Sequence, residues 1–348
     1  MKNIAEIDSN FKVGTELDRD DITFYDCRDE KFRIYGIFYK DYCFHRLPEE
    51  VSRTVSERVH ILGKNTAGGR VRFKTDSKCI AISVKYDEPG KMPHFAFTGS
   101  MGFDMYVGDF HTKTYAPACT TEEGYESAFD FPDKEMRDIT INFPLYSSVK
   151  SLHIGLDNDA LIEKSSDYIN EKPVVYYGSS ITQGGCASRP GTCYQAIISR
   201  RFNCDYVNLG FSGNAKAEDE MIDYINSLDM SLFVYDYDHN APTVEHLQNT
   251  HEKMFKAIRK DHPELPIIMM SRPKIALTDE EIQRLAIVET TYKNAIEAGD
   301  KNVYFIPGPS LCELCGNEGT VDGCHPTDFG FASMAKVLGD LIEKNNLI

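Results

Sequence analysis

The period of the hydrophobic pattern changes near the middle of the chain, and this change restricts the folds that the sequence can adopt. From about Val51 to Gly155, short apolar segments are separated by turn residues, as in RVRFKTDS, CIAISVKYDEPG and DITINFPLYS. Apolar residues recur at every second position within several segments, for example at Ile80, Ile82 and Val84. This alternation is typical of strands with one buried face. We therefore predict an antiparallel β-sandwich of the jelly-roll type.

After about residue 170, apolar runs of strand length alternate with longer segments of helical period. Strands are predicted at Val174–Tyr177, Tyr206–Leu209, Leu232–Tyr235, Ile267–Met270 and Val303–Ile306. Helices are predicted at Tyr194–Phe202, Asp219–Ser227, Val244–Lys260, Asp279–Ala298 and Phe329–Lys344. Strands joined through helices run parallel, and the helices cover both faces of the sheet. We expect a three-layer α/β/α domain at residues 170–348, with a flavodoxin-like five-stranded parallel sheet, after a β-sandwich domain at residues 1–160.

The net charge restricts the class of partner. The chain has 54 acidic and 38 basic residues and a formal net charge of −16 at pH 7. Such a charge disfavours nucleic acid and anionic membranes as partners. The first thirty or so residues contain no apolar run of signal-peptide length, and no later stretch reaches the length of a membrane span. We expect a cytoplasmic protein that acts on a small neutral molecule.

The cysteines do not suggest a disulfide framework or a metal site. There are 10 of them, spread singly along the chain apart from one C-x-x-C motif at Cys312 and Cys315. In a chain without an export signal, this distribution favours free thiols. Neither a second pair nor a His pair at ligand spacing accompanies the motif, as a zinc site would require. We expect no metal and no cofactor.

The loop after the first parallel strand contains a candidate nucleophile. Ligands of open parallel sheets bind at the carboxyl ends of the strands, so functional residues are expected directly after each strand. The first strand leads into Gly178–Gly185, with the sequence GSSITQGG, in which Ser180 follows the turn. Taken alone, this octapeptide fits a simple strand-to-helix turn as well as a nucleophile loop.

A serine hydroxyl requires a base to accept its proton, and histidine is the usual one. His325 lies in VDGCHPTD, directly before the last predicted helix, and Asp322 precedes it by three residues. An aspartate at this spacing can orient the imidazole and stabilise its charged form. The alternative is a turn followed by a helix cap at Thr327 or Asp328.

Acyl transfer also requires hydrogen-bond donors where negative charge develops. The loop after the second strand contains Gly213, where the absence of a side chain lets a backbone N–H approach an oxyanion. The loop after the third strand contains Asn240, whose amide is a second candidate donor. A strand-to-helix turn at Gly213 and a helix cap at Asn240 are the alternatives.

The ordered set GSSIT, NLGFSGN, YDHNAP and DGCHPTD resembles the four sequence blocks of the SGNH hydrolases, also called GDSL esterases. The resemblance implies that Ser180 is the nucleophile and first oxyanion donor, that Gly213 and Asn240 are the other donors, and that Asp322 and His325 complete the triad. The usual Gly-Asp-Ser is altered at Ser179, which is not the nucleophile.

The first half carries a further resemblance. Gly102–Tyr106, with the sequence GFDMY, is similar to the G-x-D-L-Y motif of a β-sandwich that precedes the catalytic domain in a two-domain branch of that family. This branch contains acylhydrolases, and related two-domain esterases deacetylate carbohydrates. The roles of Asp104 and Tyr106 within the motif stay open between substrate binding and structure.

Further candidates for substrate binding lie near the predicted mouth of the site. Charged candidates follow the first, third and fourth strands at Arg189, Asp238 and Arg272, and Gln183 belongs to the nucleophile loop. Either arginine can bind an oxygen-rich ligand or pair with a local carboxylate. His239 lacks the Asp-x-x-His arrangement and is not expected to be the base.

These features predict a serine esterase that hydrolyses small acyl esters, with an acetylated oligosaccharide as the preferred substrate. The alternatives are a general short-chain acylhydrolase and an inactive carbohydrate-binding protein with an esterase fold. A homo-oligomer is compatible with the sequence, which does not specify the oligomeric state.

Overall fold

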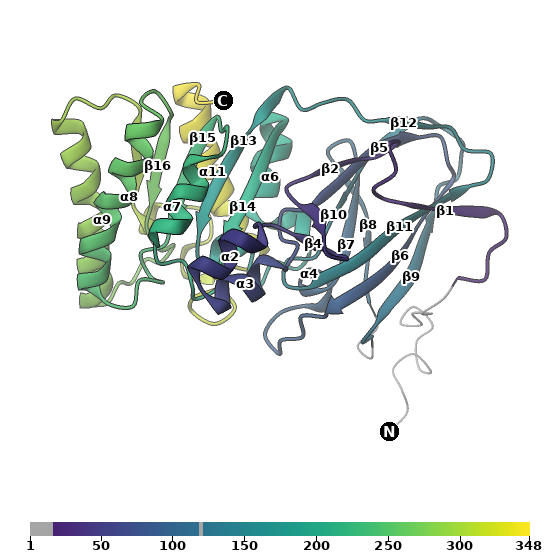
Figure 1. Ribbon diagram of the computed structural model, residues 1–348, viewed down its shortest axis with the longest axis horizontal. Helices are drawn as coiled ribbons and strands as arrows, with labels where there is room; N and C mark the ends of the chain where they lie inside the picture. Colours follow the sequence, from purple (N-terminus) through teal and green to yellow (C-terminus); the bar gives the residue numbers. More distant parts are fainter. Residues whose placement is uncertain (1–16, 118–120) are drawn as a thin grey trace.

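The computed structural model describes residues 17–117 and 121–348 and contains both antiparallel and parallel sheets (Figure 1). In Figure 1, the antiparallel strands lie on the right, and the parallel sheet with its helices lies on the left. The first sixteen residues of the predicted domain at 1–160 lie outside the described part of the chain.

The antiparallel portion consists of two sheets that enclose one core. One sheet has the strand order β1-β11-β6-β9, and the other has the order β12-β5-β10-β7-β8, with β2 paired to β5. Their bounds are β1 (Ile22–Asp26), β2 (Arg33–Tyr35), β5 (Arg70–Thr75), β6 (Cys79–Glu88), β7 (Phe103–Val107), β8 (Phe110–Tyr115), β9 (Gly124–Asp130), β10 (Arg137–Asn142), β11 (Ser148–Asp157) and β12 (Ile162–Lys164). Val71 and Phe73 of β5 pack with Ile80 and Ile82 of β6 in the core between the sheets, as the alternation predicted. The predicted β-sandwich is confirmed.

The parallel sheet has the strand order β14-β13-β15-β16-β17, which is the flavodoxin-like order 2-1-3-4-5. The strands are β13 (Asn170–Gly178), β14 (Cys204–Gly210), β15 (Leu232–Asp236), β16 (Ile267–Met270) and β17 (Val303–Ile306). The helices are α5 (Ser180–Gln183), η2 (Pro190–Thr192), α6 (Tyr194–Phe202), α7 (Asp219–Asn226), α8 (Val244–Asp261), α9 (Asp279–Glu297), α10 (Gly308–Leu311), η3 (Gly316–Glu318) and α11 (Asp328–Asn345). The predicted three-layer fold is confirmed.

Alternate residues of β13 pack into two different hydrophobic cores. Val175 and Tyr177 of β13 belong to the core beneath α7, α8 and α9. Val174 and Tyr176 belong to the core beneath α6 and α11 on the opposite face. Because strand side chains alternate between faces, a strand buried on both sides is apolar throughout.

Local sequence signals explain where several helices begin and end. Thr278 and Glu281 form a reciprocal capping box at the start of α9, and Thr243 accepts a hydrogen bond from the His246 N–H at the start of α8. Asn203 ends α6 in the left-handed conformation, at φ +45°.

The segment at 49–63 differs from the prediction. Strand spacing was expected from about Val51, but the structure has two helices, α2 (Glu49–Val55) and α3 (Glu57–Gly63). Ser56 separates them and caps α3 by accepting the N–H of Val59. Leu47 and Val59 pack into the core beneath α7, so this segment covers the parallel sheet rather than the sandwich. The prediction was wrong because each helix has only seven residues, which is too short for a clear helical period.

Other elements lie outside the predicted strands. The hairpin of β3 (Phe38–Lys40) and β4 (Cys43–His45) lies between β2 and β5 in the chain, and the short helix α4 (Phe97–Ser100) lies between β6 and β7. The division into domains at 1–160 and 170–348 stays a prediction. Across the described residues, none of the helices combines the length and the apolar character that crossing a bilayer requires.

Candidate active site

Ser180 lies at the carboxyl edge of the parallel sheet, directly after β13. The strand order reverses at β13, with β14 on one side and β15 on the other, and ligands of such sheets bind at this position. Ser180 is the first residue of α5, and the Ser179 hydroxyl caps this helix by accepting the N–H of Ile181 at 3.1 Å. Ser180 is only 6% exposed, so its orientation is fixed by the surrounding protein.

His325 and Asp322 reach Ser180 from the loop before α11. The distance from His325 Nε2 to Ser180 Oγ is 3.0 Å, and the distance from His325 Nδ1 to Asp322 Oδ2 is 2.7 Å. The three side chains predicted as a triad therefore lie in one hydrogen-bonded chain. This arrangement can transfer the hydroxyl proton to the imidazole and so activate the serine oxygen for attack.

Asp322 is held in its charged form by its own loop. Its Oδ1 accepts the N–H groups of Cys324 at 3.0 Å and of His325 at 2.8 Å. Burial opposes ionisation of this carboxyl, but the hydrogen bonds from His325 and Cys324 outweigh it and lower the pKa of Asp322 to about 2. The carboxylate is thus charged at neutral pH and favours the tautomer whose Nε2 lone pair faces Ser180.

The predicted oxyanion donors lie on adjacent loops at the same edge of the sheet. Gly213 follows β14 and has a φ of +67°, with open space where a side chain would start. Asn240 follows β15, and its Oδ1 accepts the N–H of Ala215 at 3.4 Å, which ties the two loops together. The N–H of Ser180 is at the start of a helix, where no intrahelical bond uses it. Their convergence on one oxyanion stays a prediction.

Two protein-family models match the two portions of the chain. Residues 171–343 match the model of the GDSL-like lipase/acylhydrolase family. Residues 22–162 match the model of the GxDLY domain, the N-terminus of SGNH-hydrolase-type esterases. The chain belongs to the GDSL-like lipase/acylhydrolase family. It is therefore a carboxylic ester hydrolase, as the resemblance of its sequence blocks predicted.

Solved structures share this fold over most of the chain. A Bacteroides ovatus protein described as a GDSL-like lipase is 28% identical, with a TM-score of 0.83 over 93% of this chain and 97% of that chain. A salicylyl-acyltransferase from a tetracycline biosynthetic pathway is 18% identical, with a TM-score of 0.75 over 94% of this chain and 98% of its own. An acetyl xylan esterase from the rumen bacterium Butyrivibrio proteoclasticus is 13% identical, with a TM-score of 0.59 over 94% of this chain and 100% of its own. No curated protein matches the chain in sequence.

In this GDSL-family chain, the GxDLY-like motif contacts the loop that follows Ser180 and α5. Asp104 is fully buried, and its Oδ2 accepts the Gly191 N–H at 2.9 Å and the Arg189 guanidinium at 3.0 Å. The Arg189 guanidinium also donates to the Tyr106 hydroxyl, and Asn142 donates to the second Asp104 oxygen at 2.8 Å. Three predicted substrate residues thus contact one another, and their contact with substrate stays a prediction.

Gln183 links three loops instead of facing open solvent. It is fully buried, its Nε2 donates to Asn65 Oδ1 at 3.0 Å, and its Oε1 accepts the Ser212 N–H at 3.1 Å. These bonds connect α5 with the Gly213 loop and with the antiparallel portion. The predicted contact of Gln183 with substrate has no support from this position.

Asp238 and Arg272 connect the loops around the site through hydrogen bonds and an ion pair. Asp238 accepts the N–H groups of His239 at 2.9 Å and of Arg272 at 3.2 Å. Burial opposes ionisation of Asp238, but hydrogen bonding to the His239 ring outweighs it and lowers the pKa of the Asp238 carboxyl. Arg272 pairs with Glu281 at 2.6 Å and lies 3.5 Å from the carbonyl of Gly323 in the His325 loop. The contact of Asp238 and Arg272 with substrate stays a prediction. In the structure, both side chains bind neighbouring residues of the protein.

Two residues near Ser180 were missed by the sequence analysis. The Tyr146 hydroxyl, from the antiparallel portion, donates to the backbone carbonyl of Ser180 at 3.2 Å. Asp236, at the end of β15, is buried and accepts a hydrogen bond from the Thr182 hydroxyl. A carboxylate that ends the apolar run LFVYD was a usable signal for Asp236, whereas no local pattern marks Tyr146.

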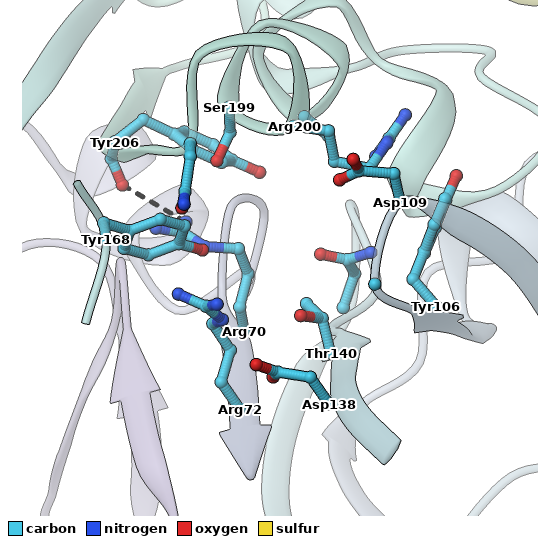
Figure 2. Close-up of a pocket in the computed structure, with 14 residues that line it drawn as sticks. Arg70, Arg72, Tyr106, Asp109, Asp138, Thr140, Tyr168, Ser199, Arg200 and Tyr206 are labelled. Carbon is cyan, nitrogen blue, oxygen red and sulfur yellow. Dashed lines mark hydrogen bonds between the residues drawn. The ribbon is translucent and has the colours of Figure 1, made fainter. Parts of the chain in front are cut away.

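A separate cavity of about 230 Å³ lies between the two portions of the chain (Figure 2). Arg70, Arg72 and Tyr106 line it together with Arg200, and Arg200 donates to the Gly191 carbonyl at 2.8 Å. The cavity wall therefore reaches the loop after the nucleophile, but none of the three triad side chains lines the cavity.

Proposed function

We propose that this chain is a serine esterase that removes small acyl groups, above all acetyl, from oligosaccharides. In this proposal Ser180 is the nucleophile, His325 the base and Asp322 the carboxylate that orients the base. The observation that carries it is the hydrogen-bonded chain from Asp322 Oδ2 through both ring nitrogens of His325 to Ser180 Oγ, with distances of 2.7 and 3.0 Å.

The first half-reaction transfers the acyl group to the enzyme. Ser180 Oγ attacks the ester carbonyl carbon while its proton passes to His325 Nε2. The carbonyl oxygen becomes an oxyanion that accepts hydrogen bonds from the N–H groups of Ser180 and Gly213 and from the Asn240 amide. The imidazolium then returns the proton to the leaving alcohol oxygen as its bond to carbon breaks, and the acyl group remains on Ser180.

The second half-reaction uses water in place of the alcohol. His325 accepts a proton from water as the water oxygen attacks the acyl carbon, and the oxyanion forms again at the same donors. When this intermediate collapses, Ser180 Oγ leaves and takes the proton back from His325. The carboxylic acid is released, and Asp322 stabilises the imidazolium in both half-reactions without accepting its proton.

The choice of substrate rests on the loop after Ser180 and on the structural neighbours. This loop, Gly184–Gly191, has the sequence GGCASRPG, which contains Ser188 and Arg189 but no large apolar side chain that could shield a fatty chain. The acetyl xylan esterase shares the two-portion fold over 94% of this chain. In the present chain the antiparallel portion reaches Ser180 through Tyr146, so the sandwich side can form one wall of a cleft for a sugar.

Acetate release tests the proposal directly. Acetylated xylo-, manno- and gluco-oligosaccharides are incubated with the enzyme beside p-nitrophenyl acetate and a long-chain p-nitrophenyl ester. We expect acetate release from at least one sugar class and complete loss of release in Ser180→Ala. Hydrolysis of the long-chain ester with none of the acetylated sugars would overturn the substrate assignment.

Ser179→Ala is the matched control, because Ser179 precedes the nucleophile but does not contact His325. Loss of its cap on α5 is expected to cost about 1 kcal/mol of stability while most activity remains. A serine-directed phosphonate distinguishes the inactive carbohydrate-binding alternative, since only an activated Ser180 is labelled. Full activity of Ser180→Ala would overturn the serine mechanism.

A further inference from the structure

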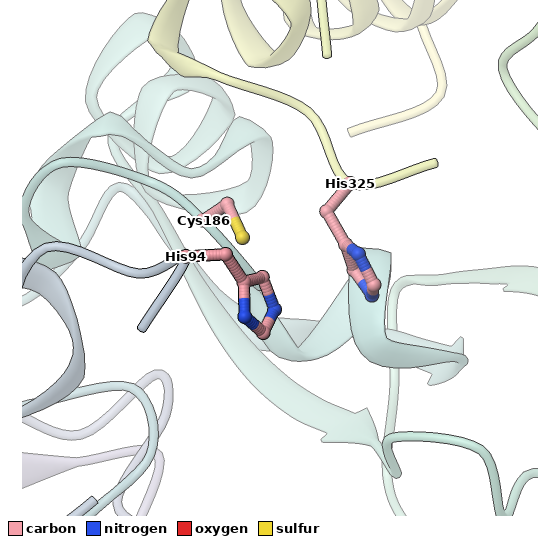
Figure 3. Close-up of side chains that lie close together, drawn as sticks. All are labelled: His94, Cys186 and His325. Carbon is pink, nitrogen blue, oxygen red and sulfur yellow. The ribbon is translucent and has the colours of Figure 1, made fainter. Parts of the chain in front are cut away.

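Three side chains that zinc-binding proteins use as ligands lie together beside the triad (Figure 3). His94 comes from the loop before α4, Cys186 from the loop after α5, and His325 from the loop before α11. One potential ligand atom from each of the three residues lies within 4.8 Å of the other two. In Figure 3 the Cys186 sulfur lies above the His94 ring, and the ring of His325 lies to the right of both. The ring centroids of His94 and His325 are 5.7 Å apart.

This set of side chains suits a thiophilic divalent cation. Zinc binds imidazole nitrogen at about 2.0–2.1 Å and thiolate sulfur at about 2.3 Å, so neighbouring ligand atoms of a tetrahedral site are roughly 3.4 Å apart. The ligand atoms of His94, Cys186 and His325 lie within 4.8 Å of one another, so they must approach more closely to bind zinc. His94 is exposed, and rotation of its side chain can bring its ring nitrogen toward the other two ligand atoms. Two histidines and one cysteine leave a fourth position for water, which is the pattern of an accessible zinc site.

The backbone at Cys186 supports a specific role for this residue. Cys186 adopts the left-handed conformation with φ +74°, which is uncommon for a residue with a side chain. Strained conformations of this kind are retained where the surrounding structure fixes them, and they cluster at functional sites. Cys186 is a free thiol.

We propose that His94, Cys186 and His325 form a binding site for a thiophilic divalent cation such as Zn²⁺, and that occupation of this site inhibits the esterase. This inference rests on the proposed function, because inhibition follows from the use of His325 by both sites. Both nitrogens of His325 already have a partner, Nδ1 with Asp322 at 2.7 Å and Nε2 with Ser180 at 3.0 Å. A cation on either nitrogen therefore breaks one bond of the triad.

The experiment measures cation binding and inhibition separately. Zn²⁺ is titrated into the metal-free enzyme by calorimetry, and hydrolysis of p-nitrophenyl acetate is followed at the same Zn²⁺ concentrations. We expect one Zn²⁺ per chain, inhibition in parallel with binding, and recovery of activity after addition of EDTA. Co²⁺ provides a second readout, because a cysteine ligand produces thiolate-to-cobalt charge-transfer absorption.

His94→Gln and Cys186→Ser test the ligands. Each variant is expected to keep esterase activity in the absence of Zn²⁺ and to raise the half-inhibitory Zn²⁺ concentration at least about tenfold. Cys324→Ser is the matched control, because Cys324 is adjacent to His325 in sequence but is not part of the cluster. It should leave Zn²⁺ inhibition unchanged.

These measurements distinguish failure of the cation site from failure of the proposed serine mechanism. Inhibition that is equal in wild type, His94→Gln and Cys186→Ser, or an absence of Zn²⁺ binding, would overturn the cation site. Ser180→Ala is expected to lose activity but still bind Zn²⁺ by calorimetry. If Ser180→Ala binds Zn²⁺ and also remains active, the cation site stands and the proposed serine mechanism fails.

Discussion

The carboxylate of Asp104 and the guanidinium of Arg189 form an ion pair of 3.0 Å that joins the antiparallel portion to the loop after Ser180 and α5. The Asp104 side chain is fully buried, whereas that of Arg189 is 23% exposed. Removing one partner of a buried pair leaves an uncompensated charge and costs more than the pair itself contributes. The GxDLY-like motif of this chain therefore stabilises the start of η2, next to the site.

Arg189→Met is expected to lower the free energy of unfolding by about 2–4 kcal/mol, because Asp104 then stays buried without its cation. Urea unfolding at pH 7 measures the change. Asp104→Asn in the same background should recover part of the loss, since the buried group is then neutral.

The control for this prediction is Arg201→Met on the surface. Arg201 pairs with the exposed carboxylates of Asp340 and Glu343, so its replacement should change stability by less than about 1 kcal/mol. Equal effects of Arg189→Met and Arg201→Met would refute the structural role of the buried pair.

Asp322→Asn is expected to lower kcat for p-nitrophenyl acetate by about 10³-fold or more with little change in KM, because the neutral amide no longer stabilises the imidazolium or its productive tautomer. Steady-state kinetics at pH 7.5 gives both constants. Asp340→Asn, on the exposed face of α11, should leave kcat unchanged and controls for the loss of one negative charge. A kcat for Asp322→Asn within tenfold of wild type would remove Asp322 from the mechanism.

Asn240→Ala is expected to lower kcat by about 10²–10³-fold while KM stays similar, because the amide donates mainly to charge that develops in the transition state. Asn214→Ala is a suitable comparison, since the Asn214 amide donates to the Ser212 carbonyl at 2.7 Å within the neighbouring loop. We expect only a few-fold loss for that variant. If the two variants lost the same activity, loop stability rather than oxyanion binding would explain both results.

Much of the α/β portion could be predicted because its signals are local. Strand runs such as Ile267–Met270 and Val303–Ile306 have the predicted bounds, since each is a short apolar segment between clear turn residues. The proximity of Ser180 and His325 could be predicted for a related reason: parallel strands place the residues that follow them at one edge of the sheet. The hydrogen-bonded contact of Ser180 with His325 joins residues 145 positions apart, yet each residue lies in its own recognisable loop.

The contacts between the two portions could not be predicted from local patterns. Tyr146 reaches the Ser180 carbonyl across 34 positions, and Arg189 reaches Asp104 across 85 positions. Such contacts depend on how the sandwich docks against the parallel sheet, and no periodicity encodes that docking. Gln183 shows the same limit, because this polar residue was predicted to bind substrate, whereas its side chain is fully buried.

Asp236 provides a pH-dependent prediction of stability. Burial raises the pKa of Asp236 from 3.8 to about 7, although hydrogen bonding to Thr182 opposes the shift. The folded protein therefore binds this proton more tightly than the unfolded chain does. The stability contributed by protonated Asp236 is fully present below about pH 4 and is lost as the pH rises to about 7.

Asp236→Asn removes this titration but keeps an oxygen that can accept the Thr182 hydroxyl. The variant should be more stable than wild type at pH 8, by up to about 4 kcal/mol for a shift of roughly three pKa units, and the difference should vanish near pH 4. Urea unfolding of both proteins at pH 4, 6 and 8 measures the difference. Because the amide is neutral throughout, a stability difference that stays constant over this range would mean that Asp236 keeps an ordinary pKa in the folded protein.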